Sequence, residues 1–589
     1  MTEPKPTPTT RARLPYRCAN FATLAEGLDY AAQGQCGFNF YSARGQLLSA
    51  LPYAELRDRA IALARGLIAA GLNRGDRVLM IADTDPDFMI AFFACQYAGL
   101  LPASAAIPTS LGGREAYIAS LRRLLQSTGS RAAMAPDSLI EYLREAADGL
   151  DLPLVGGPQD FYNLAPRDAA LRTWQKDERC YLQFSSGSTR FPLGIDISQR
   201  VLMANAYAIA TYGLEIGAED RCTSWLPLYH DMGLVGFALV PMLTQMSVDY
   251  LATRDFARRP LMWPTLITMN GGTLSYSPSF GYDLAARRLH DGNLRVEGID
   301  LSRWRGAGIG GDMIQPKVLE RFADIFGPYG FRREAFVPSY GMAETALAIS
   351  FAPLDTGVEI DRVDRQRLAE RGEAVTAPAD ASNARDFVLC GKPLGGHRIE
   401  VRDETGRALP ERKLGRVFVS GPSIMVGYFE EPEATAAVLQ PDGWLDTGDL
   451  GYLTGGQIVI TGRSKDLIII NGRNIWPQDL EWSVEDGLGL RRGDTAAFAF
   501  EGDDGSERVM MLVQCRVPDD ERRQQLARDV AAILQRSHAV EAGVSLVPPH
   551  GLPQTSSGKL SRTRAKANWL SGLYQAGPDG MRKTASGAS

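Results

Sequence analysis

The chain has 589 residues, of which 45% are hydrophobic and 22% charged, with a formal net charge of −6 and a pI near 5.7. This length exceeds what a single hydrophobic core supports, so we expect two or more domains of ordinary globular composition. A mildly acidic chain without a polybasic block gives no electrostatic reason to expect nucleic-acid binding or attraction to an anionic membrane.

Cysteine usage and apolar runs indicate a compartment. The seven cysteines are widely spaced, contain no Cys-x-x-Cys pair, and are odd in number, which argues against a disulfide framework. The N-terminal segment MTEPKPTPTTRAR lacks the apolar core of a secretory signal, and the longest apolar run, residues 88–101, is too short to span a bilayer. We therefore predict a cytoplasmic protein without membrane insertion.

Helical and strand patterns alternate along the first part of the chain, after a Pro/Thr-rich start at residues 1–13 that we expect to be disordered. Residues 53–70 have helical periodicity, residues 77–82 read as a buried strand, and residues 88–99 read as a buried helix. Such alternation predicts α/β layers built on parallel strands.

An apolar run, YLQF at residues 181–184, stops at a small loop rich in hydroxyl groups. The loop residues are Ser185, Ser186, Gly187, Ser188 and Thr189. Small residues let backbone N–H groups approach phosphate oxygens, and the hydroxyls donate further hydrogen bonds. The loop is not a Walker A motif, and many Ser/Gly-rich junctions serve turn geometry alone, so other motifs must support a phosphate-binding interpretation.

The sequence pattern changes in the second half of the chain, from alternating helices and strands to a polar segment followed by short strands. Residues 355–386 are polar and poor in strand signal, which predicts a long loop that is either functional or disordered. Residues 398–402, 415–420 and 457–460 follow as short strands separated by turn residues and predict a β-rich subdomain.

A domain boundary is predicted close to residues 462–466. The segment beyond it has its own helices, at residues 480–484 and 521–536, and its own strands, at residues 495–500 and 509–515. By composition, the last residues, 572–589, form a disordered tail.

Four further motifs follow the loop in order: YGMAET at 340–345, WLDTGDL at 444–450, GRSKD at 462–466 and QTSSGKL at 554–560. Together they resemble the adenylate-forming superfamily of acyl-CoA synthetases, peptide-synthetase adenylation domains and luciferases, over about residues 14–569. The resemblance implies an α/β fold with a large N-terminal adenylation domain, residues 14–463, made of two α/β layers and a β-rich subdomain. A small, mobile α+β C-terminal domain, residues 464–571, would follow, with Lys465 at the hinge.

One branch of that superfamily is indicated by three segments. Residues 355–386 resemble the insertion that marks fatty acyl-AMP ligases, in which it is thought to discourage thioester formation with free CoA. RCANFATL at 17–24 and CGKPLGGHRI at 390–399 also resemble that branch. The alternative is that the insertion is only a variable surface loop.

In this family the protein joins a carboxylate to the α-phosphorus of ATP and expels pyrophosphate, so its task is positioning and charge stabilisation. The resemblance assigns the β- and γ-phosphates to the loop from Ser185 to Thr189. The chain departs from the family pattern at Arg190, where glycine is common, and at Leu193, where lysine is common. Arg190 either supplies the missing positive charge or simply faces solvent.

The resemblance also implies the remaining ATP contacts. Tyr340, followed by Gly341, would stack on adenine, Glu344 would hold Mg²⁺, and Thr345 is the remaining hydroxyl for the α-phosphate. Asp449 would accept both ribose hydroxyls, with Arg463 behind it. Without the other motifs, the preferred interpretation of Glu344 would be a helix cap, and the Asp449 motif could be a turn that binds no ligand.

Catalysis and acyl binding are assigned by the same resemblance. Lys559 would stabilise charge between the carboxylate and the α-phosphate, and His230 would lie near the carboxylate, with an exposed lysine and a buried core histidine as the alternatives. The acyl pocket would be lined by Met232 and Gly233 of residues 225–236, by Ser277 and Phe280 of residues 275–284, and by Gly308 of residues 306–313.

The predicted function is therefore that of a fatty acyl-AMP ligase of lipid metabolism. It would use ATP and Mg²⁺ to activate a medium- or long-chain fatty acid and pass the acyl group to the phosphopantetheine thiol of an acyl carrier protein. The first alternative is a long-chain fatty acyl-CoA ligase. The second is a non-catalytic protein that binds acyl groups or nucleotides.

Overall fold

The computed structural model describes residues 14–108, 113–164, 168–185, 192–291, 298–381, 383–470, 473–502, 506–517, 519–555 and 559–574. The predicted disordered start, residues 1–13, lies outside them. The chain divides into two compact units, between Thr461 and Gly462. We call them the first unit, up to Thr461, and the second unit, from Gly462 onward together with Ala369–Arg371. The sequence predicts this division at residue 463.

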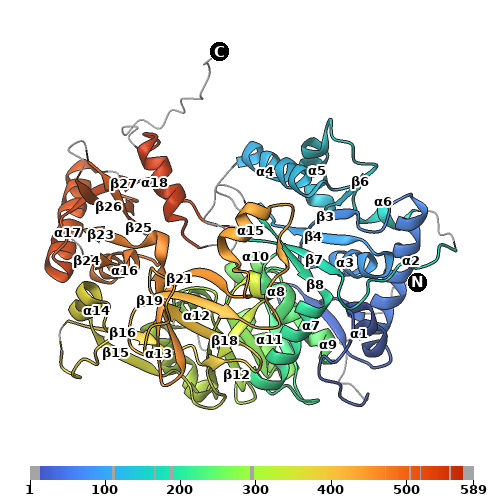
Figure 1. Ribbon diagram of the computed structural model, residues 1–589, viewed down its shortest axis with the longest axis horizontal. Coiled ribbons are helices and arrows are strands. Elements are labelled where there is room, and N and C mark those ends of the chain that lie inside the picture. Colours follow the sequence, from blue (N-terminus) through green and yellow to red (C-terminus); the bar gives the residue numbers. More distant parts are fainter. Residues whose placement is uncertain are drawn as a thin grey trace. The chain divides into compact units, whose positions relative to one another are not determined.

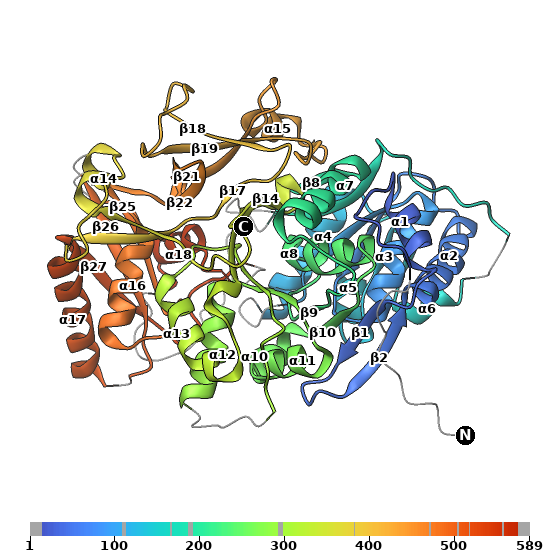
Figure 2. The ribbon, with the colours of Figure 1, turned by 90° about the horizontal axis from the view of Figure 1, so that it is seen from below.

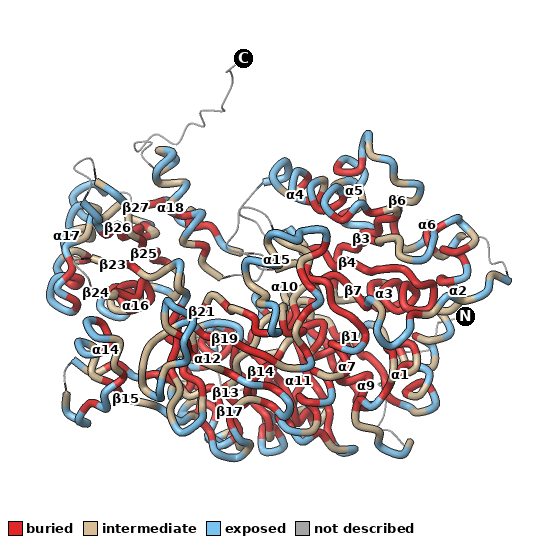
Figure 3. Tube along the Cα trace, viewed as in Figure 1, coloured by how far each residue is buried: buried red, intermediate tan, exposed pale blue. Residues whose placement is uncertain are grey.

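The first unit contains a seven-stranded sheet whose central strands are parallel and buried. Figure 3 shows these strands almost wholly in the colour of buried residues. In spatial order its strands are β20 (Gly427–Tyr428), β8 (Gly194–Ser198), β7 (Arg179–Phe184), β4 (Leu101–Ala105), β3 (Arg77–Ile81), β5 (Ala132–Met134) and β6 (Leu154–Gly156). The predicted strand at residues 77–82 is confirmed as β3.

A nine-stranded sheet forms the second α/β layer of the first unit. In spatial order its strands are β17 (Lys392–Pro393), β14 (Ala348–Phe351), β13 (Phe336–Gly341), β12 (Gly306–Ile309), β11 (Leu274–Ser277), β9 (Cys222–Ser224), β10 (Val248–Leu251), β1 (Gly37–Tyr41) and β2 (Leu47–Pro52). From β13 to β1 the neighbours run parallel, so the carboxyl ends of β11, β12 and β13 lie at the same edge.

The predicted β-rich subdomain is confirmed as a four-stranded sheet of β18 (Arg398–Arg402), β19 (Gly415–Ser420), β21 (Leu445–Thr454) and β22 (Gln457–Arg463). The first two strands have the predicted bounds. These strands could be predicted because each contains buried valine or isoleucine residues and turn residues separate one strand from the next.

Helices cover both sheets of the first unit (Figures 1 and 2). They are α1 (Leu24–Ala31), α2 (Tyr53–Ala69), α3 (Pro86–Ala98), α4 (Gly113–Thr128), α5 (Ile140–Ala147), α6 (Pro158–Tyr162), α7 (Gln199–Ala208), α8 (Asp231–Leu234), α9 (Val240–Leu243), α10 (Thr253–Arg258), α11 (Met262–Asn270), α12 (Ser279–Asp291), α13 (Pro316–Phe326) and α15 (Pro432–Val438). A further helix, α14 (Arg365–Arg371), has its last three residues in the second unit. Among the described helices, none is long and apolar enough to cross a membrane.

The buried helix α3 shows how local sequence sets an element. Its N-cap Asp85 accepts a hydrogen bond from the backbone of Phe88, and Pro86 occupies the first turn. Gly99 ends the helix in the left-handed conformation at φ 68°, where a side chain would also meet the carbonyl oxygen of Arg172 at 2.4 Å. Burial raises the pKa of Asp85 to about 6.

Residues 355–386, predicted as a long loop that is either functional or disordered, instead contain regular secondary structure. Strands β15 (Ile360–Asp364) and β16 (Ala384–Val388) pair in antiparallel fashion, with α14 between them. Asp361 anchors this hairpin because it accepts hydrogen bonds from Arg412 and Tyr452 of the β-rich subdomain. The strand signal was missed because the partner strands are short and the anchoring contacts are distant in sequence.

The second unit is a small α+β fold. It contains α16 (Pro477–Leu488), α17 (Asp520–His538) and α18 (Arg562–Leu570). Its strands are β23 (Ile468–Ile470), β24 (Arg473–Ile475), β25 (Thr495–Glu501), β26 (Glu507–Gln514) and β27 (Ala542–Val547), the last three forming one sheet. The predicted helices and strands of this region are confirmed, with bounds longer by a few residues at most ends.

The predicted disordered tail begins too early. Tyr574 donates a hydrogen bond to the carbonyl oxygen of Gly551 and, like Trp569, packs against a hydrophobic cluster of the second unit. These contacts hold the chain through Tyr574, and of the predicted tail residues 575–589 lie outside the described residues.

Candidate active site

The end of β13 carries the turn predicted to bind adenine and Mg²⁺. A side chain at Gly341 would place its Cβ 1.9 Å from the carbonyl oxygen of Leu347, because β14 returns directly beside β13. Glycine is therefore required here for close backbone approach. The turn closes through η6 (Ala343–Thr345), and Ala346 has a positive φ of 64°, which is uncommon for a residue with a side chain.

Tyr340 and Asp449 are 109 residues apart and meet in the first unit. The phenol of Tyr340 donates a hydrogen bond to Oδ2 of Asp449 at 2.8 Å. Asp449 is buried on β21, and its backbone N–H donates to the hydroxyl of Thr447. The structure thus brings the predicted adenine residue and the predicted ribose residue into direct contact.

Glu344 contacts a residue that the sequence analysis missed. The phenol of Tyr428, on β20, donates to Oε1 of Glu344 at 2.9 Å, and the backbone N–H of Met425 donates to the carbonyl oxygen of Glu344. Nothing in the local pattern marks Tyr428, because it is a single tyrosine in a Gly-Tyr pair between an apolar run and a helix start.

Thr345 is fully buried, and its hydroxyl donates to the carbonyl oxygen of Met342 at 2.8 Å. This hydrogen bond holds the turn together. The α-phosphate contact suggested for Thr345 stays a prediction, and in this arrangement the hydroxyl is already used within the turn.

The predicted phosphate loop connects β7 to β8. At its base the backbone N–H of Ser185 donates to the carbonyl oxygen of Leu193, and the backbone N–H of Leu193 donates to the hydroxyl of Ser185. Leu193 therefore takes part in closing the loop through its backbone. The other predicted loop residues, Ser186, Gly187, Ser188 and Thr189, lie outside the described residues, as does Arg190.

His230 caps the short helix α8. Its Nδ1 lies 2.6 Å from Oδ1 of Asp231, and the backbone N–H of Met232 donates to the same oxygen at 2.7 Å. Gln183, on β7 just before the phosphate loop, donates to the carbonyl oxygen of Tyr229 at 2.7 Å. This hydrogen bond ties the segment that bears His230 to the base of the predicted phosphate site.

The predicted acyl-pocket residues have different environments. Met232 is buried, and its methyl group lies 3.5 Å from the position of a Cβ on Gly311. A side chain on Gly233 would meet the carbonyl oxygen of Pro227 at 2.1 Å, so the close packing of the turn requires glycine here.

The other three belong to or follow β11 and β12. Ser277 is fully buried and donates to the carbonyl oxygen of Pro278, and Gly308 lies under the ring of Tyr276, where a Cβ would be within 2.0 Å. Phe280 is 43% exposed and packs edge-on against Trp225.

The second unit carries the predicted lysine. Lys559 ends a loop whose base is closed by two hydrogen bonds with Thr555, one from each backbone N–H. Lys465 and Arg463 are exposed, and Lys465 lies in a single 3₁₀ turn (Ser464–Asp466). The roles assigned to these three residues remain predictions.

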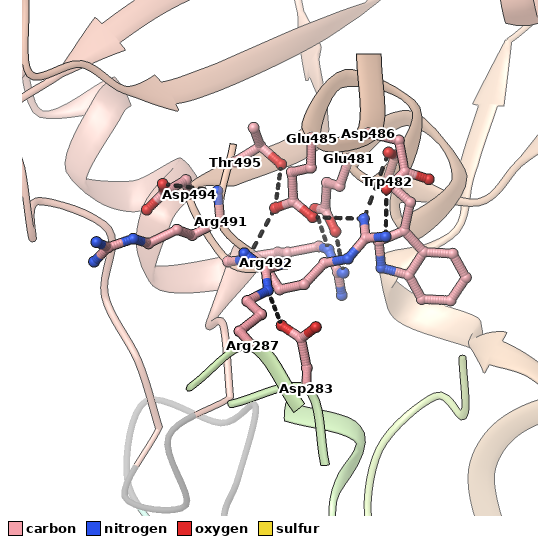
Figure 4. A network of polar contacts seen from close by, with 12 residues as sticks. Asp283, Arg287, Glu481, Trp482, Glu485, Asp486, Arg491, Arg492, Asp494 and Thr495 are labelled. Atoms are coloured by element: carbon pink, nitrogen blue, oxygen red, sulfur yellow. Dashed lines mark hydrogen bonds and ion pairs between the residues drawn. The ribbon is translucent and has the colours of Figure 1, made fainter. Parts of the chain in front are cut away.

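A buried charge network lies around Glu481 and Glu485 of α16 (Figure 4). Arg562, which follows the lysine loop, donates bidentately to Glu481 and also to Asp466 at 3.1 Å. Glu485 lies one turn beyond Glu481 on α16 and accepts from Thr495 and from the backbone of Gly493. Burial, together with the nearby charge of Glu481, raises the pKa of Glu485 to about 7.

Known proteins share this architecture. The family model of AMP-binding enzymes matches residues 30–429. A putative acyl-CoA synthetase of Caulobacter vibrioides is 52% identical over 96% of this chain and 98% of its own. A long-chain-fatty-acid–AMP ligase of Mycolicibacterium smegmatis is 31% identical, over 88% of this chain and 89% of that protein.

Solved structures agree. One from a study of fatty acyl-adenylate ligases from E. coli and L. pneumophila has a TM-score of 0.90 and 45% identity, covering 95% of this chain and all of that one. A fatty acid AMP ligase from Legionella pneumophila has a TM-score of 0.69 and 26% identity, covering 94% and 97%. The chain therefore belongs to the AMP-binding enzyme family, and it is an adenylate-forming enzyme of the fatty acyl ligase type.

Proposed function

We propose that the enzyme activates a medium- or long-chain fatty acid to the acyl-adenylate and then transfers the acyl group to the phosphopantetheine thiol of an acyl carrier protein. The observation that carries this proposal is the 45% identical fatty acyl-adenylate ligase structure, which matches the chain over nearly its whole length. A medium-chain-fatty-acid–[acyl-carrier-protein] ligase of Moorena producens, 30% identical over 94% of this chain, supports the choice of acceptor.

The proposed reaction has two steps. A carboxylate oxygen of the fatty acid attacks the α-phosphorus of ATP and pyrophosphate leaves. The carrier thiol then attacks the acyl carbonyl, loses its proton, and AMP leaves. In the first step Tyr340 and Asp449 would hold the nucleoside, and Lys559 would stabilise the charge that develops between the carboxylate and the α-phosphate.

The residues of the candidate site are suited to bind the Mg²⁺ of a Mg-ATP complex. Mg²⁺ is commonly held through one or two carboxylates and substrate phosphates while it keeps several waters. Glu344 offers one carboxylate, and among the described residues no group of three or more histidine, cysteine or acidic side chains forms a protein-only metal site. Glu344 would hold the cation, which would neutralise phosphate charge during the displacement.

A second candidate function is a long-chain fatty acyl-CoA ligase, favoured by the description of the 52% identical relative. Both functions share the first step, and only the acceptor thiol differs. The folded insertion β15–α14–β16 supports the first candidate, because Lys413 and Arg367 both pair with Glu373 and hold it as a defined element rather than a loose loop.

A product assay separates the candidates. The purified enzyme is incubated with ATP, Mg²⁺ and a panel of fatty acids, with CoA, with a phosphopantetheinylated carrier protein, or with neither. We expect acyl-AMP to accumulate without an acceptor and the carrier to be acylated, with little acyl-CoA. Efficient acyl-CoA formation would favour the second candidate, and no adenylate with any acid would leave only a binding role.

A further inference from the structure

Tyr428 holds the carboxylate predicted to bind the metal. Its phenol donates to Oε1 of Glu344 at 2.9 Å, and both side chains are half-buried. The two residues are 84 positions apart and lie on different elements, β20 and the turn after β13. The contact is therefore a product of the tertiary structure and has no counterpart within either segment.

The strand that carries Tyr428 also borders the predicted phosphate loop. Tyr428 pairs with Ile195 on β8, and the backbone N–H of Phe429 donates to the carbonyl oxygen of Gly194 at 2.7 Å. Strand β8 is the return strand of the hairpin whose loop is closed by Ser185 and Leu193. One two-residue strand thus connects the base of the loop with the turn that bears Glu344.

The orientation of a metal-binding carboxylate depends on its hydrogen bonds. A donor to one oxygen restricts rotation about the last side-chain bond and thereby decides where the second oxygen points. Such outer contacts are typically worth about 10–100-fold in metal affinity. A phenol is well suited to this task because its hydroxyl donates one hydrogen bond from a rigid ring.

We propose that Tyr428 is a positioning residue for metal–nucleotide binding: its phenol fixes the carboxylate of Glu344 in the orientation that receives Mg²⁺ on the phosphates of ATP. This inference rests on the proposed function, in which Glu344 is the metal-binding residue. It adds a residue to the site that no motif identified.

If Tyr428 only held its strand in place, loss of the phenol hydroxyl would not change Mg²⁺-dependent ATP binding specifically. The strand is held by backbone pairing with β8, and the backbone N–H of Tyr428 donates to the hydroxyl of Thr435 at 2.9 Å. Neither contact uses the phenol hydroxyl. Tyr428→Phe therefore removes the hydrogen bond to Glu344 while leaving the ring and these backbone contacts in place.

The test measures how much Mg²⁺ strengthens ATP binding. Dissociation constants for ATP are measured by calorimetry without fatty acid, once with EDTA and once with saturating Mg²⁺, and their ratio is the metal-dependent gain. Two variants without the hydroxyl, Tyr428→Phe and Tyr428→Leu, are compared so that poor folding of one leaves the other. Tyr162→Phe is the matched control, since it removes a phenol that donates to Asp87 at 2.7 Å in the same unit.

We expect the gain to fall by about 10–100-fold in both Tyr428 variants, with the dissociation constant in EDTA unchanged within about twofold. The gain in the control should equal that of the wild type. In Glu344→Gln the metal-dependent gain should fall by at least as much. Adding Tyr428→Phe to that variant should reduce the gain little further, because the phenol acts through Glu344.

An unchanged gain in the Tyr428 variants, or a wild-type enzyme whose ATP affinity does not respond to Mg²⁺, would overturn the proposal. An equal loss of ATP affinity in EDTA and in Mg²⁺ would also overturn the proposal, since it would indicate a structural role for Tyr428. Failure of the proposed function is recognised separately: the wild type would then form no acyl-adenylate from any fatty acid, whatever the calorimetric ratio.

Discussion

The buried carboxylate of Glu485 should make the second unit less stable as the pH rises. Burial and the neighbouring charge of Glu481 raise its pKa from 4.5 to about 7. A carboxyl group that binds its proton more tightly in the folded state stabilises that state below the unfolded pKa, and this stabilisation is lost as the pH rises through the folded pKa. Glu485→Gln removes the titration but keeps a neutral acceptor for Thr495 and Gly493.

The magnitude follows from the two pKa values. The contribution of Glu485 to the free energy of unfolding should decrease by about 2.5 kcal/mol between pH 5 and pH 8. The difference in unfolding free energy, wild type minus Glu485→Gln, should therefore fall by that amount over this range. The variant gains relative stability at alkaline pH because it no longer buries a negative charge.

The unfolding of the second unit can be followed through Cys515, which is buried and is the one cysteine beyond residue 461 in the sequence. Pulsed alkylation across a urea series, quantified by mass spectrometry, gives a transition for each chain at each pH, and comparison at equal pH cancels the pH dependence of alkylation. Asp486→Asn is the control, because it removes an exposed partner of Arg492. The difference in unfolding free energy between the wild type and this control should change by less than about 0.5 kcal/mol over the same pH range. A pH-independent difference for Glu485→Gln, or one that rises with pH, would refute the reasoning.

Three further predictions concern single residues. Lys559→Ala should slow acyl-adenylate formation by about 10²–10³-fold in a pyrophosphate-release assay, and an equal loss in the control Lys566→Ala would contradict the assigned role. Asp449→Asn should raise KM for ATP by about 10–100-fold, because a charged acceptor for the ribose becomes neutral while Tyr340 keeps an oxygen to donate to; an unchanged KM would remove Asp449 from the site. Arg562→Gln should destabilise the second unit by about 3–5 kcal/mol, since it leaves the buried carboxylate of Glu481 without its bidentate partner, and the same Cys515 alkylation would show a loss below about 1 kcal/mol if this is wrong.

Many elements of the fold could be predicted from local sequence. The helix α2 ends as expected before Gly71, and the strands β18 and β19 have the predicted bounds, because periodicity and turn residues act over a few positions. The order of the five motifs likewise indicates the family from the sequence alone, since each motif is a short contiguous segment whose residue types suit phosphate, base or ribose binding.

The contacts that make the candidate site depend on the tertiary structure. Tyr340 meets Asp449 across 109 positions and Tyr428 meets Glu344 across 84, and no periodicity or turn signal encodes such pairs. The hairpin of β15 and β16 was missed for the same reason, because distant Arg412 and Tyr452 anchor Asp361. Sequence by itself determined which chemical groups are available and where many of the helices and strands lie, while packing of the sheets decided which of those groups touch, because side chains far apart along the chain meet only when whole layers fold together.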